Sequence, residues 1–240
     1  MQMDHVELLM NFGLTRQEAR IYFLLLTEGA LSGYEAAKRI GISRSNAYAA
    51  LAALVDKGAA YVAEEQAVRY HAVAIQEFCH NKLHYLKELA ACLERQIPEK
   101  ILRDESYLTI RGRQHIEDKF RNMLQQTQER VYLAVSPSVA DLFQEELLRL
   151  TTDGKKVVLL TQYPYILEGA TVYYTEREDG QIRLITDSSY ALTGEMREDR
   201  DSACLYSANP NLVRLLKDAL ANEIQLIQIG KQQKLPNKQD

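Results

Sequence analysis

The sequence has no tryptophan, only three cysteines and no long apolar run. Cys79, Cys92 and Cys204 form no CxxC pair, and an odd, sparse set favours reduced thiols over a disulfide framework. A membrane helix needs roughly 18 consecutive apolar residues, and the N-terminus lacks the basic start, apolar core and small-residue cleavage site of a secretion signal. We therefore expect a cytoplasmic protein with no membrane partner.

Positive charge is also scarce, since 29 Lys and Arg residues face 33 Asp and Glu residues and give a net charge of -4. A nucleic-acid binder usually shows a basic surface. Any contact with DNA must therefore use locally concentrated charge, and two copies of the chain would gather more of it than one. The 240 residues are enough for two modest domains.

The first 74 residues predict four short helices and a β-hairpin, which is the order of a winged helix-turn-helix. Two capping boxes, Thr15 with Glu18 and Ser32 with Glu35, mark helix starts, and glycines mark the ends. The expected helices cover residues 4–12, 13–29, 32–41 and 43–57, and the expected strands lie within 59–73 around the polar tip Glu64, Glu65 and Gln66. The apolar positions of the first two helices at helical spacing, expected to face the core, are Val6, Leu9, Met10, Ala19, Tyr22, Phe23 and Leu26.

The fourth helix has the asymmetry that a groove-reading helix needs. Its core-facing positions are Ala47, Ala50, Leu51, Leu54 and Val55, and its other face carries Ser45, Tyr48, Ala49 and Ala52, flanked at the N-terminal end by Arg44 and Asn46. Arg44 could reach a guanine edge or a phosphate, and Asn46 could pair with adenine or donate to a phosphate. Ser43 and Ser45 could bind phosphate at the positive end of the helix dipole, while Tyr48 could donate its hydroxyl to the DNA backbone.

The alternative is an ordinary amphipathic helix with a solvated face, in which Ser43 is a plain N-cap. The helix alone favours neither interpretation. The surrounding sequence favours contact with DNA, because the helix follows a paired helix and glycine turns and precedes a hairpin with Arg69 near its base. The candidate DNA-binding residues are Ser32, Lys38, Ser43, Arg44, Ser45, Asn46, Tyr48 and Arg69.

Residues 75–97 predict a longer helix with a heptad seam. The seam consists of Cys79, Leu83, Leu86, Ala90, Leu93 and Ile97. A helix packed on its own domain is the alternative, because the seam is short for a coiled coil. We favour a dimer interface, since the preceding domain is complete without this helix. Pro98 should end it, and residues 98–105 are expected to form a hinge.

Residues 105–230 alternate between strand and helix patterns, which predicts an α/β domain with helices layered on a sheet. The expected strands are 107–112, 130–136, 155–162, 170–177, 181–196 and 201–208, and the expected helices are 113–128, 137–150 and 209–230. The inward positions of the first two of these helices are Ile116, Phe120, Met123, Leu124, Leu142, Leu147 and Leu150. The polar tail, 231–240, is expected to fray.

Several segments together resemble a known family. The stretch FGLTRQEARIYFLLLTEGALSGYEAAKRIGISRSNAYAALAALVDKGAA (12–60) resembles the winged helix of the TrmB family of transcriptional regulators, through its GLTRQEARIY opening, the GISRSNAY helix start and the LVDKG exit. VRYHAV (68–73) is similar to the family's passage from wing to linker helix. YLTIRGRQHIEDKF, RVYLAVSP and SACLYSANPNLVRLLKDAL resemble the family's phospholipase D-like middle domain. The resemblance implies a dimeric regulator that binds operator DNA and responds to a small molecule. We expect this chain to be a short form, without the β-rich region of sugar-sensing members.

A phospholipase D-like fold also raises the hypothesis of a phosphodiesterase. That chemistry needs a histidine, a lysine two residues later and an aspartate five residues beyond the lysine. His80 and Lys82 have the first spacing, but position 87 is a lysine. His5, His71, His84 and His115 lack the lysine, and no nucleotide-binding loop, nucleophile elbow or metal-ligand spacing is present. We therefore expect a non-enzymatic protein without metal or cofactor.

Two acidic stretches leave alternatives open. EREDG (176–180) is expected to be a hairpin turn rather than a metal site. Asp187 and Glu195 flank SSYALTG and could line a pocket, or they could belong to a solvated strand-turn-strand. A third class of function is a ligand-sensing or protein-interaction module with a vestigial winged helix. The acidic net charge of the chain supports this alternative.

The sequence thus predicts a two-domain α+β / α/β protein. Residues 1–74 form a winged helix that binds double-stranded DNA, 75–104 a dimerising linker helix and hinge, and 105–230 an α/β effector domain, followed by the tail. The expected partners are DNA, a second copy of the chain and a small-molecule effector. The effector would shift the population between two angles of the recognition helices.

Overall fold

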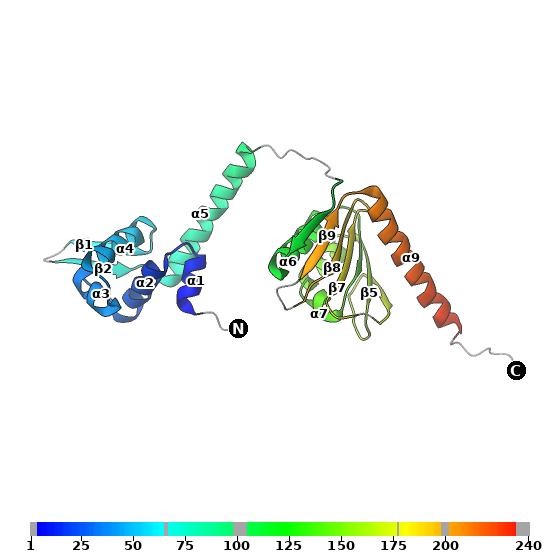
Figure 1. Ribbon diagram of the computed structural model, residues 1–240, viewed down its shortest axis with the longest axis horizontal. Coiled ribbons are helices and arrows are strands. Elements are labelled where there is room, and N and C mark those ends of the chain that lie inside the picture. The colour runs from blue at the N-terminus through cyan, green and yellow to red at the C-terminus, as the bar shows by residue number, and fades with distance from the viewer. Residues whose placement is uncertain (1–3, 65–66, 98–104, 177, 198–201, 234–240) are drawn as a thin grey trace. The chain divides into compact units, whose positions relative to one another are not determined.

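The computed structural model describes residues 4–64, 67–97, 105–176, 178–197 and 202–233 (Figure 1). The chain divides into two compact units, Met1–Lys100 and Ile101–Asp240, each of which is considered by itself. Four predicted features lie partly or wholly outside the described residues: the hinge that follows Pro98, the wing tip at 65–66, Arg177 in the acidic stretch and the end of the tail, 234–240. Within the described residues, no helix is long and apolar enough to cross a membrane.

The N-terminal unit has the predicted winged helix-turn-helix order. Four helices are followed by an antiparallel hairpin in which Tyr61 pairs with His71, and by a long helix. Leu31 adds a further bridge to the hairpin through two backbone hydrogen bonds with Tyr70, of 3.1 and 2.8 Å. The elements are α1 (His5–Asn11), α2 (Arg16–Glu28), α3 (Gly33–Ile40), α4 (Arg44–Asp56), β1 (Ala60–Glu64), β2 (Val68–Ala72) and α5 (Ile75–Gln96).

The buried face of α2 differs in part from the predicted one, and one residue of α1 predicted to face the core does not. Ile21, Tyr22 and Leu25 are buried, whereas Phe23 and Leu26 are exposed, as is Met10 in α1. Two apolar stripes one residue apart run along α2, and the contacts that α2 makes with α4 and β2 select the stripe that contains Ile21. The other stripe lines an open apolar groove made by His5, Leu8, Leu9, Phe23, Leu26 and Ile75.

The C-terminal unit is built on one seven-stranded sheet with the order β3-β9-β8-β7-β4-β5-β6. Strands β4, β5 and β6 are parallel to one another, and the other neighbours are antiparallel. The strands are β3 (Leu108–Arg111), β4 (Arg130–Ala134), β5 (Lys156–Thr161), β6 (Thr171–Tyr174), β7 (Gln181–Thr186), β8 (Tyr190–Glu195) and β9 (Ala203–Ser207). The helices are α6 (Arg113–Gln126), α7 (Pro137–Asp141), α8 (Gln144–Thr152) and α9 (Pro210–Gln233).

Helices cover both faces of this sheet, as the alternating pattern predicted. Leu133 and Leu159 pack with α6, α7 and α8 in one apolar cluster, in which the rings of Phe120 and Phe143 stack 4.2 Å apart. Ala134, Val158, Leu160, Ile185 and Ala191 face the other way and pack with Val213 and Leu220 of α9. Successive residues of a central strand point to opposite faces, so a strand buried on both faces is apolar throughout.

Two predictions for this unit, the helix at 137–150 and the turn at 176–180, are wrong in detail. The helix expected at 137–150 is interrupted between α7 and α8, because Phe143 turns into the core while Leu142 points outward with 40% of its surface exposed. The stretch 181–196 is the hairpin β7–β8, which agrees with the strand-turn-strand alternative and turns at Asp187 and Ser188 with left-handed φ values of 50° and 53°. The stretch 176–180 is not a hairpin turn, since β6 lies at the sheet edge and β7 pairs with β4.

Asp187 holds the β7–β8 turn against the start of β4, whereas Glu195 lines a shallow hollow with Arg183 and Thr193. Its carboxylate accepts hydrogen bonds from the backbone N–H groups of Gln128, Glu129 and Arg130 at 2.9, 2.8 and 3.0 Å. Burial acts to raise the pKa of Asp187, but the three N–H donors and the positive charge of Lys155 outweigh burial and hold this pKa below its usual range.

We expect Asp187→Asn to lower the free energy of unfolding of the C-terminal unit by about 1–2 kcal/mol at pH 7, because the N–H groups lose a charged acceptor. A carboxyl whose pKa is depressed in the fold stabilises it above its unfolded pKa, about 3.9, and loses this effect as the pH falls through the folded pKa. Urea unfolding between pH 7 and pH 3 should therefore show the variant converging on the wild type below about pH 4. The exposed Asp218→Asn serves as control, and a pH-independent difference for Asp187→Asn would contradict this account.

Candidate nucleic-acid interface

Helices α3 and α4 form the helix-turn-helix, joined by a short turn. Gly41 ends α3 with a left-handed φ of 75°, and Ser43 begins α4 by accepting a hydrogen bond on its hydroxyl oxygen from the backbone N–H of Asn46, at 3.2 Å. The predicted inward face of α4 is buried at Ala47, Leu51 and Leu54. The predicted outward side chains are exposed: Ser43, Arg44, Ser45, Asn46, Tyr48, Ala49 and Ala52.

Arg44, in the first turn of α4, is supported by an aromatic ring that the sequence analysis did not single out. Its guanidinium lies over the ring of Tyr34 in α3, 4.4 Å from the ring centroid. An arginine on an aromatic face gains about 0.5–1 kcal/mol at an exposed site and keeps its hydrogen-bonding edge available. Tyr34 therefore positions Arg44 at the exposed start of α4.

Tyr48, one turn further along α4, lies against the first residue of α3. A Cβ placed on Gly33 would come within 2.4 Å of the Tyr48 ring, closer than side chains tolerate. Glycine at position 33 thus allows the two helices of the motif to approach, and the Tyr48 ring remains about half exposed.

We expect Gly33→Ala to push the half-exposed Tyr48 ring outward and to lower the stability of the N-terminal unit by at most about 1 kcal/mol, because the ring can rotate toward solvent. Removing the ring as well, in the double variant Gly33→Ala with Tyr48→Ala, should recover most of this loss relative to Tyr48→Ala alone. Thermal unfolding of the four proteins measures the coupling. Additive losses would show that Gly33 and Tyr48 do not constrain each other.

Ser32 and Arg69 are tied to one carboxylate at the base of the wing. Glu35 accepts hydrogen bonds from the backbone N–H and the hydroxyl of Ser32, both at 2.8 Å, and Arg69 lies 3.9 Å from the same carboxylate. The backbone hydrogen bond from Ser32 is the largest of the effects that lower the pKa of Glu35. Arg69 also donates to the backbone oxygen of Ala30 at 3.1 Å. These two predicted DNA-binding residues therefore anchor the α2–α3 loop to the hairpin.

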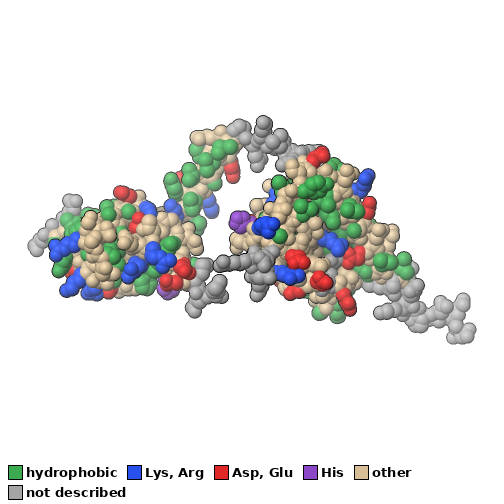
Figure 2. Space-filling view, in the orientation of Figure 1, with side chains coloured by type: hydrophobic (Ala, Val, Ile, Leu, Met, Phe, Trp, Pro, Cys, Tyr) green, Lys and Arg blue, Asp and Glu red, His purple; other side chains and the backbone are tan. Residues whose placement is uncertain are grey.

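The candidate interface carries a local excess of positive charge, although the net charge of the whole chain is negative. Between residues 36 and 55 the chain carries three basic side chains, Lys38, Arg39 and Arg44, and no acidic one. Figure 2 shows Lys and Arg side chains grouped at the end of the N-terminal unit that carries α3 and the hairpin. Arg39 pairs with Glu28, whereas Lys38 is exposed on α3. This concentration is the kind that phosphate contacts need.

The end of α4 is fixed to the rest of the unit by a different lysine. Lys57 donates to Glu18 at 2.6 Å and to the backbone oxygen of Gly13 at 2.9 Å. Burial acts to raise the pKa of Glu18, but the bonds from Lys57 and Thr15 outweigh it and lower that pKa. Lys57 thus serves the packing of α4 against α2.

Helix α5 carries an exposed apolar row beyond its first turn. Phe78 is fully buried in the winged-helix core, and Cys79 is half-buried against the same core. The remaining seam residues point to solvent, with exposed fractions of 51% for Leu83, 45% for Leu86, 47% for Leu93 and 62% for Ile97, and Ala90 is exposed between them. Leu89, which the heptad spacing did not select, is also exposed.

These elements define a winged helix-turn-helix unit with a long helix attached to its wing, followed by an α/β unit. Residues 8–76 match the family described as sugar-specific transcriptional regulator TrmB. Over these residues the chain is similar to the TrmB family, as the sequence motifs predicted.

Similarity to individual proteins extends beyond residues 8–76. Protein YrhO of Bacillus subtilis is 25% identical over 242 residues, which cover 96% of this chain and 88% of that protein. The archaeal chromatin protein TrmBL2 is 20% identical over 92% of this chain and 96% of that one, with a TM-score of 0.44. Nuc from Salmonella typhimurium, a phospholipase D family member, is 9% identical over 49% of this chain and 93% of that one, with a TM-score of 0.37.

Proposed function

We propose that the protein is a transcriptional regulator that binds operator DNA through α4. The observation that carries the proposal is the exposed first turn of α4, where Arg44 is held on Tyr34 beside Ser43, Ser45 and Asn46 in a TrmB-family winged helix. In helix-turn-helix proteins the N-terminal residues of the second helix contact base edges in the major groove. The solved structure of TrmBL2, which is described by its mode of DNA binding, supports the same partner.

Each candidate residue has a role that its position supports. Arg44 and Asn46 present the donors that read guanine and adenine edges. Ser43, Ser45, Tyr48 and Lys38 lie around them and supply phosphate contacts, which fix the register of the helix on the duplex. Ser32 and Arg69 act through the loop and the hairpin that they hold together.

The protein binds as a dimer in this proposal, and α5 pairs the two copies through its exposed apolar row. Helical seams with apolar residues at alternating spacings of three and four residues associate by knobs-into-holes packing. Two paired copies present two recognition helices to half-sites about one helical turn of DNA apart, roughly 34 Å. A small-molecule effector at the C-terminal unit changes the population of two dimer geometries and with it the affinity for DNA.

The test is a titration of the purified protein against a fluorescent duplex from its own upstream region and against a random duplex, across a salt series. We expect tighter binding to the upstream duplex, and a logarithm of affinity that falls linearly with the logarithm of salt concentration. Flat signals on both duplexes, with and without added cell extract, would contradict DNA binding. Such a result would favour the alternative, a ligand-sensing module with a vestigial winged helix. The net charge of -4 supports that alternative.

A further inference from the structure

A cavity of about 400 Å³ lies in the N-terminal unit, where the end of α4 meets the first half of α5. One wall is the last residue of α4 and the turn after it, residues 56–58. The other wall is the side of α5 that carries Phe78, Lys82 and Tyr85. The cavity therefore lies between the helix proposed to read DNA and the helix proposed to pair two copies.

The positive group of this cavity is the ammonium of Lys82. It lies 5.6 Å from the centroid of the Tyr85 ring, and a Cβ placed on Gly13 would be 3.6 Å from it. Lys57 also reaches Gly13 and donates to its backbone oxygen at 2.9 Å, but Lys57 is paired with Glu18. Within the described residues, no hydrogen bond or ion pair engages Lys82. Because one carboxylate serves two ammonium groups beside this turn, Lys82 attracts an anion.

The negative group is the carboxylate of Asp56, the last residue of α4. Its side chain is exposed and, in the part of the chain that the structure describes, has no hydrogen-bond or ion-pair partner. A carboxylate at the C-terminal end of a helix faces the negative end of the helix dipole, so a cation bound beside it is favourable. Asp56 and Lys82 thus give the cavity one available group of each sign.

Aromatic rings supply the apolar part of the cavity. Phe78 is almost fully buried and packs against the ring of Phe12, with centroids 6.4 Å apart. Tyr85, two turns further along α5, is exposed. Aromatic rings attract one another in offset and edge-to-face arrangements, beyond the gain from burying their area. The two rings therefore favour an aromatic group on the ligand.

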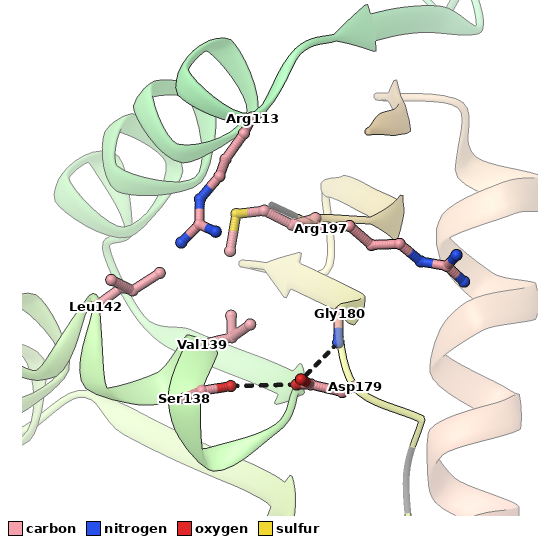
Figure 3. Close-up of a pocket in the computed structure, with 8 residues that line it drawn as sticks. Arg113, Ser138, Val139, Leu142, Asp179, Gly180 and Arg197 are labelled. Carbon is pink, nitrogen blue, oxygen red and sulfur yellow. Dashed lines mark hydrogen bonds between the residues drawn. The ribbon is translucent and has the colours of Figure 1, made fainter. Parts of the chain in front are cut away.

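A cavity in the C-terminal unit lacks such available charges (Figure 3). Its carboxylate, Asp179, accepts hydrogen bonds from the Ser138 hydroxyl at 3.2 Å and from the Gly180 backbone N–H at 3.1 Å. Its guanidinium, Arg113, donates from Nε to Glu117 at 2.6 Å. Both charged groups are engaged inside that unit, in contrast to Asp56 and Lys82.

We propose that the cavity between α4 and α5 binds an aromatic α-amino acid. The carboxylate of the ligand lies against Lys82, its ammonium against Asp56, and its ring against Phe78 and Tyr85. A volume of about 400 Å³ is at the small end of ligand sites, which span about 300–1,000 Å³, and suits a ligand of this size. Either charge alone admits many ions, whereas the two together select a zwitterion.

Pairing of two copies through the seam of α5 leaves this cavity accessible. At about 100° per residue, Asn81, which also lines the cavity, lies on the opposite side of α5 from the seam. Tyr85 lies more than a quarter of a turn from the seam by the same spacing. The ligand site and the proposed dimer interface therefore occupy different sides of one helix.

A regulatory role of this ligand rests on the proposed function. The ligand contacts α4 and α5 at once, and in the proposed dimer α5 sets the spacing of the two recognition helices. Binding favours the angle between α4 and α5 that best closes the cavity around the ligand, and so changes the population of dimers that fit the operator.

The site is tested on the full chain without DNA, by calorimetric titration with L-phenylalanine. Three comparison ligands each lack one recognised group: glycine lacks the ring, hydrocinnamate lacks the ammonium and phenethylamine lacks the carboxylate. We expect L-phenylalanine to bind roughly tenfold or more tightly than each of them, since each loses a ring contact or a charged partner. Failure of L-phenylalanine to bind, or equal binding of any comparison ligand, would overturn the proposal.

Two variants assign the charges of the ligand to the two side chains. Lys82→Gln should weaken L-phenylalanine roughly tenfold or more and leave phenethylamine unchanged, because phenethylamine has no carboxylate. Asp56→Asn should weaken L-phenylalanine without weakening hydrocinnamate, which has no ammonium. The matched controls are Lys87→Gln and Glu94→Gln, at exposed positions of α5 outside the cavity. Circular dichroism checks that all four variants fold, and equal losses in variants and controls would overturn the site.

A separate measurement distinguishes this proposal from the proposed function. Adding L-phenylalanine to the operator titration should change DNA affinity by about fivefold or more in the wild type but not in Lys82→Gln. Ligand binding without any DNA binding would leave the site standing and remove the regulator. Ligand binding with unchanged DNA affinity would leave both activities and overturn the regulatory role of the ligand.

Discussion

Replacing Leu83 and Leu86 with aspartate should convert the protein to monomers and lower its affinity for operator DNA by about a hundredfold or more. Both side chains are exposed in one copy, so the substitutions cost the fold of that copy little. Two carboxylates in a paired apolar seam would be desolvated and would face two more from the second copy, which opposes pairing. In a dimer, binding of one half-site raises the effective concentration of the second recognition helix at the other half-site. Losing the pairing removes this gain, which typically raises the DNA affinity by a factor of about 10²–10⁴.

The oligomeric state is measured by sedimentation equilibrium, and DNA affinity by fluorescence polarisation at the same salt concentration. Ala91→Asp is the matched control, because Ala91 is exposed on α5 outside the seam. It should remain dimeric and bind DNA normally. A dimer that survives the double substitution would show that α5 does not pair the copies, even if α4 still binds DNA.

Arg44→Ala should weaken operator binding by about 1–3 kcal/mol if the guanidinium reads a base, with a much smaller effect on a random duplex. If Arg44 touches only phosphate, the loss should be similar on all duplexes and the salt slope should fall by about one unit. Titrations of both duplexes across a salt series separate these two results. Unchanged affinity on both would remove Arg44 from the interface.

Two further variants test how Arg44 is positioned. Tyr34→Phe keeps the ring beneath the guanidinium and should retain most of the affinity, whereas Tyr34→Ala should lose part of what Arg44→Ala loses. Arg16→Ala removes one positive charge from α2, outside the helix-turn-helix, and controls for net charge. Equal losses in Arg16→Ala and Arg44→Ala would mean that only total charge matters.

The sequence was most informative where a local rule decides the structure. The boxes Thr15 with Glu18 and Ser32 with Glu35 predicted the starts of α2 and α3, and both are present because capping depends on residues three positions apart. The inward face of α4 could be predicted for the same reason, since alanine and leucine recur at helical spacing on one side only. The α/β class of the second unit followed from alternating strand and helix patterns.

The errors arise where distant segments choose between local alternatives. Both stripes of α2 are apolar, and only contact with α4 and β2 determines that Ile21, rather than Phe23, is buried. The break between α7 and α8 depends on Phe143 reaching the ring of Phe120 on another helix.

The partners of the candidate site were hidden for the same reason. Tyr34 is ten positions from Arg44, and Gly33 is fifteen from Tyr48, so no short motif links them. An exposed aromatic residue next to a glycine at the start of α3 was the available signal. The roles of the candidate DNA-binding residues and of the seam stay predictions until the titrations are done.

The burial of Phe78 also has a mechanical consequence. Helix α5 is clamped at its base, where Phe78 lies 5.4 Å from the ring of Tyr22, whose hydroxyl donates to the backbone oxygen of Val73 at 2.8 Å. The rest of α5 is then a stiff arm of about 27 Å, and a tilt of about 5° at its base moves its far end by about 2 Å. The same leverage acts in reverse. In the proposed complex with DNA, a small displacement at the far end of α5, next to the linker, would rotate the winged helix and shift the first turn of α4 relative to the groove.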